Sequence, residues 1–465
     1  MRKSFLFIIF LLYTHLSFSQ QNTFNATIEA KGLSGSGKTL PFWFTHNQLG
    51  KYTTSSNLKL VTEGNISGSF LLYNDKIKLS YGTELLFCGS ENRDNVKIIQ
   101  AYAGLSWRNI SLKAGSFADE EVLGGLSASN GNILRSRNYR PYPKVSLSTN
   151  GYIQIPFVEK MFRFKAEYDE GILEDNRIIR HPHINHGMFG VQVLANNTLR
   201  FSFEVNRYIF WGGFSQQYGQ MPGGLKNYIR YVLGLKGGSD FLETDKLNVA
   251  GNQLGSYLLT VEKEVGDYHL ELRVSHPFED GSGMMLYNFK DNMYSFYIKK
   301  TPGSFIDEFL FEYLYSKNQS GNPCSISDKW KLPYGGDNYF NHGVYGSGFT
   351  YLGYSMGTPL FTPVEKNAHG ITAGFKNNRV SAFHTGAKGY LSKQISWKAM
   401  LTYSRNFGTY SNHPNNPVSR QIYSLLQVNW KSKSLPIIIS TIAAADFGSM
   451  TEKQLGFGLS FKWEL

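Results

Sequence analysis

The residues best suited to binding chemistry are concentrated between residues 131 and 144. Four cations lie within ten residues and are interleaved with two tyrosines: Arg135, Arg137, Tyr139, Arg140, Tyr142 and Lys144. Guanidinium groups offer paired N–H donors to carboxylates, and tyrosine rings offer flat faces on which sugar rings can stack. The run could bind an acidic saccharide, or it could pair with carboxylates of the same chain such as Glu167 or Asp169. Trp211, in a later aromatic run, completes the predicted site.

A pattern like a phosphate-binding loop occurs near the start of the chain. Residues 32–39 read Gly-Leu-Ser-Gly-Ser-Gly-Lys-Thr and satisfy G-x-x-x-x-G-K-T. That chemistry requires a buried strand before the loop and a helix that begins at Lys38. The preceding residues alternate with polar ones, and Pro41 followed by three aromatics gives no long amphipathic helix. We interpret the pattern as a Gly/Ser turn and predict no cofactor.

Two other clusters suggest catalysis or metal binding but have simpler explanations. The histidines of residues 181–186 surround a proline, so a turn with solvated or hydrogen-bonded rings is expected in place of a zinc site. The acidic residues between 169 and 175 could act as paired carboxylates, as in glycosidases, but Arg177 and Arg180 favour an ion-paired loop. No Gly-x-Ser-x-Gly motif is present. We predict no metal, no catalytic residue and no enzyme.

The composition is that of many aromatic-rich strands joined by glycine turns. Of the 465 residues, 15% are aromatic, 47 are glycine and only 18% are charged. The aromatics exclude a disordered chain, and the absence of sustained heptads excludes a coiled coil or helical bundle. The formal net charge of +12 favours acidic partners such as acidic glycans, and no nucleic-acid partner is expected.

Residues 1–19 have the order of a signal peptide. Arg2 and Lys3 precede an apolar stretch from Phe5 to Leu12, and residues 17–19 form a small-x-small cleavage site. No other stretch reaches the roughly 18 apolar residues of a membrane helix, and mean hydropathy is −0.30. We therefore expect export of the mature chain.

Period-two alternation of apolar and polar residues recurs from residue 58 to the end. The last segment is the clearest, because every second residue from Leu455 to Leu465 is apolar. The runs of roughly 9–12 residues match the length that crosses a bilayer at a tilt. The pattern predicts an all-β protein, a transmembrane antiparallel β-barrel of about 18 strands.

Three stretches interrupt the alternation: residues 33–57, 118–143 and 317–368. Long insertions in a barrel form external loops or fill the lumen. The expected organisation is a signal peptide (1–19), an N-terminal segment that forms part of a plug (20–57) and the barrel (58–465). The barrel carries a plug insertion near 118–143, where short helices are plausible, and a long loop near 317–368. Cys88 and Cys324 allow at most one disulfide.

The order of several short motifs resembles the Wzi-type capsule assembly proteins. The motifs are Pro41-Phe42-Trp43, Asn47–Gly50, Gly131–Lys144, Ile155-Pro156-Phe157, Tyr208–Gly213, His276–Gly283, Asn341–Tyr345 and Gly357–Leu360. The resemblance covers nearly the whole mature chain, and it implies an outer-membrane lectin whose barrel is closed at the periplasmic end by helices. It also implies that segments near 40–57 and 118–143 form the plug.

From the residues and the resemblance we expect a non-enzymatic outer-membrane protein that binds capsular or extracellular polysaccharide and promotes its attachment to the cell surface. The expected partners are that polysaccharide, outer-membrane lipid and the machinery that inserts barrels. The alternative is a porin-like channel for small solutes, which suits a polar lumen but not two plug-like segments. A third class, an enzyme acting on lipid or glycan, would require Asp169 or Glu170 for activity.

Overall fold

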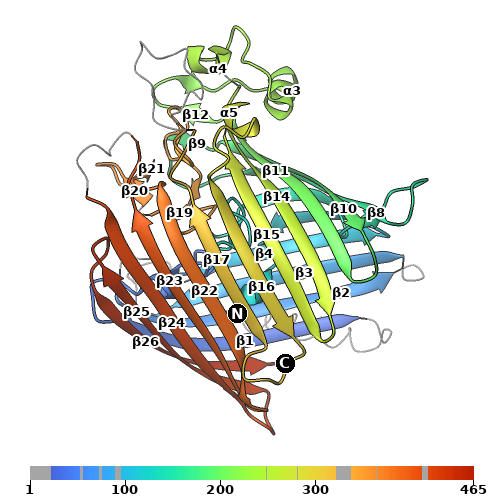
Figure 1. The fold of residues 1–465 in the computed structure, drawn as a ribbon. Helices are drawn as coiled ribbons and strands as arrows, with labels where there is room; N and C mark the ends of the chain where they lie inside the picture. The colour runs from blue at the N-terminus through green and yellow to red at the C-terminus, as the bar shows by residue number, and fades with distance from the viewer. Residues whose placement is uncertain are drawn as a thin grey trace, which may run out of the picture.

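The fold is a closed antiparallel β-barrel, seen in a computed structural model (Figure 1). The structure describes residues 22–52, 56–72, 76–89, 96–247, 249–279, 281–320, 337–362, 364–410 and 417–465. The expected signal peptide and Cys324 lie outside these residues, whereas Cys88 is buried.

Eighteen strands form the wall, as the alternation predicted. They are β1 (Thr23–Gly35), β2 (Leu58–Leu72), β3 (Ile77–Cys88), β4 (Val96–Trp107), β5 (Ile110–Ser116), β6 (Pro143–Thr149), β8 (Phe162–Ile172), β10 (His183–Leu194), β11 (Leu199–Trp211), β14 (Asn252–Val265), β15 (Tyr268–Phe278), β16 (Asn292–Lys300), β17 (Glu308–Tyr315), β22 (Val380–Ser392), β23 (Ile395–Asn406), β24 (Ser419–Lys431), β25 (Ile437–Gly448) and β26 (Gln454–Glu464). Each pairs with its neighbours along the chain, and β7 (Ile153–Gln154) adds a short pairing to β8.

The barrel closes between β1 and β26, which corrects the expected start of the barrel at residue 58. β1 pairs with both β2 and β26, and Ala30 lies opposite Phe461. The outer face of β1 carries Ala26, Ala30 and Gly32 between larger residues. These small side chains weaken the apolar side of the alternation on which strand prediction depends. The P-loop-like pattern forms the end of β1 and the turn after it.

The outer surface of the wall is apolar and the inner surface is polar. In β26, Phe457 and Phe461 are exposed on the outside, whereas Ser460 between them is buried in the lumen. Such alternation suits a wall with lipid on one side and a filled interior on the other. Among the described residues, no helix is long and apolar enough to cross a membrane.

The two ends of the barrel differ in their connections. The short turns and the C-terminus lie at one end, which we call the short-turn end. The long connections lie at the other, the long-connection end, together with α3 (Leu225–Leu233), α4 (Glu243–Leu247) and α5 (Gly281–Met284), at the top of Figure 1. In bacterial barrels the longer loops face the cell exterior and the short turns face the periplasm.

Three segments fill the lumen: residues 36–52, 117–142 and 337–362, which we call the plug. Their side chains join one buried hydrophobic cluster that includes Trp43, Ile133, Phe340 and Phe349. The plug contains only two short helical turns, α2 (Phe42–Thr45) and η1 (Leu123–Gly125), because glycines with positive φ interrupt the chain. The expected long loop therefore contributes its described second half, with β18 (Thr350–Tyr351) and β19 (Tyr354–Ser355), to the interior.

The remaining strands belong to the connections at the long-connection end. β9 (Ile179–Arg180), β12 (Phe214–Ser215) and β13 (Gly219–Gln220) form a three-stranded sheet, and β20 (Val364–Lys366) pairs with β21 (Thr372–Phe375).

The closure at β1 and β26 can be tested by a disulfide. We expect Ala30→Cys with Phe461→Cys to cross-link on oxidation, because residues directly opposite in an antiparallel pair have Cβ atoms about 4.5–5.5 Å apart. Cross-linking joins the two ends of the chain, which changes the gel mobility of the unfolded protein. The experiment uses a background in which Cys88 and Cys324 are serine.

Ala30→Cys with Leu459→Cys is the matched control, since Leu459 lies two residues from the partner on the same face. Equal cross-linking of both pairs, or none in either, would contradict the register of the closing strands.

Candidate functional site

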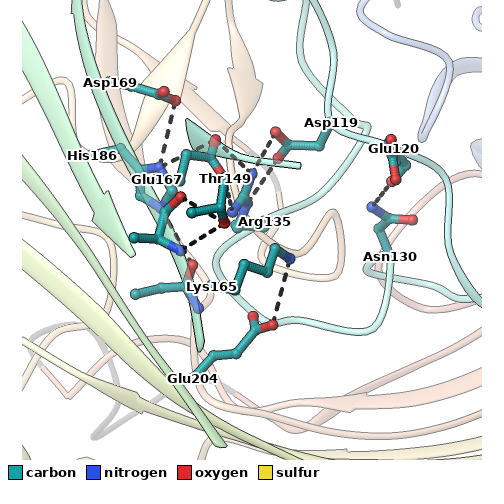
Figure 2. Close-up of polar contacts among 12 residues, drawn as sticks. Asp119, Glu120, Asn130, Arg135, Thr149, Lys165, Glu167, Asp169, His186 and Glu204 are labelled. Carbon is teal, nitrogen blue, oxygen red and sulfur yellow. Dashed lines mark hydrogen bonds and ion pairs between the residues drawn. The ribbon is translucent and has the colours of Figure 1, made fainter. Parts of the chain in front are cut away.

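The predicted basic run meets the barrel wall through a buried ion-pair network (Figure 2). Arg135, on the plug, donates Nη2–H to Asp119 Oδ1 at 2.7 Å and Nε–H to Asp119 Oδ2 at 3.0 Å. It also donates Nη1–H to Glu167 Oε2 on β8 at 3.1 Å. A planar guanidinium can satisfy two carboxylates in this way because its donors point in fixed directions. Arg135 thus joins the plug to the wall.

A second ion pair lies beside the first. Lys144 Nζ on β6 donates to Asp169 Oδ2 at 2.7 Å, and both side chains are almost fully buried. His186 Nδ1 lies 3.5 Å from the same carboxylate oxygen. The ring of His186 stacks on Tyr208 with 4.3 Å between centroids, and its Nε2 lies 3.3 Å from Asn206 Oδ1. Together, these contacts match the intramolecular pairing with Glu167 and Asp169 that the sequence allowed.

Glu167, Asp169 and His186 have the spacing of a possible metal site. The two carboxylates already accept hydrogen bonds from Arg135 and Lys144, and the positive charges of these side chains both neutralise the carboxylates and repel a metal ion. The residues present therefore fit an ion-pair network better than a metal centre.

Burial and charge act in opposite directions on the groups of this network. Burial by itself would raise the pKa of Asp119, but the adjacent Arg135 guanidinium more than offsets this effect and holds the pKa below its usual range. Tyr139 and Tyr142 have raised pKa values, chiefly because both hydroxyls are buried. The carboxylate of Asp119 is therefore charged, and the two tyrosines are neutral, across the physiological pH range.

The other residues of the predicted run also lie in the plug. Tyr139 and Tyr142 stack on each other at 6.1 Å between centroids, and Tyr142 meets Tyr351 edge to face. Arg137 Nε lies 3.7 Å from Glu121 Oε1 at a more exposed position. Burial lowers the pKa of Arg140, and its Nε atom is buried without a hydrogen-bond partner. The structure therefore brings the residues from Arg135 to Lys144 together at the plug.

Trp211 lies elsewhere, on the outer face of β11 at the long-connection end. Its Nε1–H donates to Glu170 Oε1 at 3.0 Å, and its ring stacks on His183 at 4.3 Å. Tyr228 of α3 packs on the other side, at 5.0 Å between ring centroids. The polar groups of the neighbouring strands are thus divided between two faces of the wall, since Glu170 is outside and Asp169 is inside.

The division between the two faces also explains why neither the histidines of residues 181–186 nor the acidic residues between 169 and 175 form one site. His183 lies on the outer face and His186 on the lumenal face, so the histidines of residues 181–186 do not converge on one point. Asp169 and Glu170 face opposite sides for the same reason. The acidic segment after β8 contains an ion pair, Asp175 with Arg177, at 3.2 Å.

Cavities remain in the lumen between the plug and the short-turn end. The largest, about 840 Å³, reaches the short-turn residues Asn150 and Gly151, and two others have volumes of about 510 and 250 Å³. The largest cavity is lined by cationic and acidic side chains in equal numbers, among them Lys165 and Glu204, which lie 3.5 Å apart. Such a balanced lining gives little net attraction for a polyanion.

The surface at the long-connection end carries a different set of groups. The sheet of β9, β12 and β13 exposes Phe214 and Tyr218 beside Arg180 and several glutamines. Aromatic faces, amides and cations in one patch are suited to sugar rings and their hydroxyl or carboxylate groups. This patch is not among the predicted sites, although the pair Gly212-Gly213 followed by Gln216-Gln217-Tyr218 signals an exposed turn.

Residues 20–385 match the family model of the capsule assembly protein Wzi. The chain belongs to this family. A comparison with curated proteins gives no match.

Two solved structures support the fold assignment. Wzi of Escherichia coli is 13% identical, with a TM-score of 0.57 over 94% of this chain and 83% of that one. It is described as an outer-membrane protein involved in group 1 capsule assembly and as a carbohydrate-binding β-barrel. OccK3 (OpdO) of Pseudomonas aeruginosa is 10% identical, with a TM-score of 0.50 over 98% of this chain and 99% of that one. At these identities the similarity shows the fold alone.

The role of Arg135 can be tested by removing its charge. We expect Arg135→Gln to reduce the free energy of unfolding of the plug by about 3–5 kcal/mol, because Asp119 and Glu167 would remain buried without their cation. The measurement is hydrogen exchange of residues 117–142 in the purified barrel, together with urea unfolding.

Arg137→Gln is the control from the same segment. Its acidic partner Glu121 is more than half exposed, and the hydrogen bond from Arg137 to the carbonyl of Asp119 leaves no buried charge when it is lost, so the loss should be only about 1–2 kcal/mol. Equal losses in the two variants would show that the Arg135 network does not hold the plug.

The plug should also loosen in acid because of His46. Burial lowers the pKa of His46 to about 4 from an unfolded value near 6.5, while the ring stacks on Phe42 at 3.9 Å. A depressed folded-state pKa gives stability that is complete above pH 6.5 and is lost as the pH falls toward 4. We expect protease cleavage within residues 36–52 to accelerate over this range.

His46→Gln retains a polar side chain but cannot titrate, so it should flatten this pH dependence. A residual slope is expected from His342, whose pKa burial also lowers to about 4. An unchanged pH profile in His46→Gln would rule out His46 as the source.

Proposed function

We propose that this protein is an outer-membrane, lectin-like barrel that binds capsular or extracellular polysaccharide and promotes its attachment to the cell surface. The observation that carries the proposal is the filled lumen of a chain that belongs to the Wzi family. Within the part of the chain that the structure describes, a hydrophobic plug fills the lumen, so in this proposal the glycan is held at the surface of the barrel. Holding a polymer requires contacts and no bond cleavage, so the role is not enzymatic.

The contact surface in this proposal is the sheet of β9, β12 and β13. Phe214 and Tyr218 would stack on sugar rings, and Arg180 would pair with uronate or other acidic groups. All three side chains are exposed at the end that faces the cell exterior in bacterial barrels. A formal net charge of +12 for the whole chain supports an acidic polymer as the partner.

The basic run would then have a supporting role. Arg135 and Lys144 are committed to wall and plug carboxylates, and Tyr139 and Tyr142 are buried against each other. In the proposal these residues fix the plug, and through it the connections that present the polysaccharide surface.

Residues 1–19 would direct export, after which the insertion machinery would place the barrel in outer-membrane lipid. The apolar outer face of β26, which reaches nearly to the last residue, is suited to that step. The porin alternative predicts steady conductance in a planar bilayer, whereas a plugged barrel should give none.

The proposal is tested in cells that lack the gene. We expect total polysaccharide to be unchanged while the cell-bound part falls and the part in the medium rises. Wild-type protein should restore the cell-bound part, whereas Phe214→Ser with Tyr218→Ser should not, because stacking surfaces for several sugar rings are lost.

Tyr268→Ser is the control, since Tyr268 is equally exposed but lies at the short-turn end. A fall in total polymer would indicate a role in synthesis or export. An unchanged distribution, with conductance by the purified protein, would favour the channel.

A further inference from the structure

An apolar groove of about 610 Å³ lies on the outer wall of the barrel. It crosses β6, β8, β10 and β11 and is lined mainly by carbon atoms of residues such as Leu147, Phe164, Phe189 and Val205. The groove exists because Gly187 on β10 lies between Tyr168 and Arg207 of the adjacent strands. A side chain added at Gly187 would meet no heavy atom within 4 Å, so this position is an empty slot between two large neighbours.

The helix α3 is attached to the wall at the head of the groove. Arg207 donates Nη1–H to the carbonyl of Val232 at 2.8 Å and Nη2–H to that of Tyr231 at 3.3 Å, which caps the last turn of the helix. Tyr228 bonds Glu170 Oε2 at 3.1 Å and also bonds the hydroxyl of Tyr168. Two residues that flank the slot, Tyr168 and Arg207, therefore hold the helix directly.

The free side of α3 carries an apolar stripe next to a basic one. Leu225, Ile229 and Leu233 lie four residues apart and are 76%, 47% and 63% exposed. Lys226 and Arg230 follow them by one residue each and form the adjacent stripe, in which Lys226 is exposed and Arg230 also donates Nη1–H to the carbonyl of Lys236 at 3.0 Å. Amphipathic helices with this arrangement lie at membrane interfaces, with apolar side chains toward acyl chains and cations toward phosphates.

A neighbouring connection has the same character. Residues 284–289, from the last residue of α5 onward, expose Met284, Met285, Leu286 and Phe289. The carbonyl of Met284 accepts a hydrogen bond from Tyr257 on the outer face of β14. The apolar surface of the wall thus continues onto two connections at the same end, which places the edge of the lipid-facing surface at the level of α3.

We propose that the groove at Gly187 holds an acyl chain of an anionic membrane lipid and that the phosphate-bearing head group of this lipid binds the basic stripe of α3. The groove supplies an apolar surface for an acyl chain, and Lys226 and Arg230 supply positive charge on the helix that the flanking residues Tyr168 and Arg207 hold. The bound lipid would brace α3 and so the connection of residues 212–251, which also contains β12 and β13.

The test is lipid binding by the delipidated, detergent-solubilised barrel, followed by native mass spectrometry. The probes are dioleoyl phosphatidylglycerol, dioleoyl phosphatidylcholine and dihexanoyl phosphatidylglycerol. We expect one tightly bound dioleoyl phosphatidylglycerol, held roughly thirtyfold more tightly than phosphatidylcholine, as expected for two cations close to an anionic head group. The short-chain lipid should bind more weakly because it cannot fill the groove.

Two variants separate the groove from the head-group site. Gly187→Leu fills the slot and should lower the affinity for both dioleoyl lipids by at least fivefold. Lys226→Gln with Arg230→Gln should remove the preference for phosphatidylglycerol and leave the affinity for phosphatidylcholine unchanged.

Each variant has a matched control. Gly64→Leu adds the same side chain to the outer face of β2, where it also meets no heavy atom within 4 Å. Lys76→Gln with Lys433→Gln removes two exposed charges at the short-turn end. Neither control should change lipid binding.

The proposal is overturned if wild-type protein holds both dioleoyl lipids equally, or if Gly187→Leu binds lipid as Gly64→Leu does. If Gly187→Leu fails to fold, the comparison of long and short chains on wild-type protein decides the groove, and equal affinity would reject it.

Discussion

The structure depends on one constraint: in lipid, every backbone N–H and C=O of the wall needs a partner within the protein. The sheet meets it by pairing β1 with β26, so that no strand has a free edge. Closure of the barrel also determines how the side chains are oriented. Alternate side chains must face lipid or lumen, and the lumen side therefore collects the polar groups that a lipid-facing surface cannot carry.

Those lumenal polar groups determine how the plug is held. The wall presents carboxylates to the interior, and three of them bind the plug: Glu63 accepts a hydrogen bond from Lys51, Glu167 from Arg135, and Glu312 from Ser127 and the N–H of Ala128. Buried ion pairs add little net stability, because desolvation costs nearly as much as the attraction returns. These ion pairs raise the free energy of any other position of the plug, since a shift of the plug would leave charges buried without partners.

The outer and inner faces of the same strands consequently have different roles. On β8, Asp169 anchors Lys144 inside, while Glu170 and Tyr168 anchor α3 outside. The connections at the long-connection end are therefore supported from both sides, by the plug within the barrel and by α3 against its wall. A rigid rim of this kind is suited to presenting a binding surface to a large polymer, because little conformational freedom is lost on binding.

The sequence by itself determined the class of fold and the approximate strand number, because alternation of apolar and polar residues is a local signal. It named pairing with Glu167 or Asp169 as one of two roles for the basic run, and the structure shows that pairing. It did not reveal β1, whose outer face is rich in small residues, or the burial of residues 337–362. It also grouped Trp211 with the basic run, although the two lie on opposite sides of the wall. Only the tertiary structure shows these features. The alternation of polar and apolar residues does not indicate which face of a strand points into the lumen, because the contacts that determine this orientation join segments that are distant in the chain.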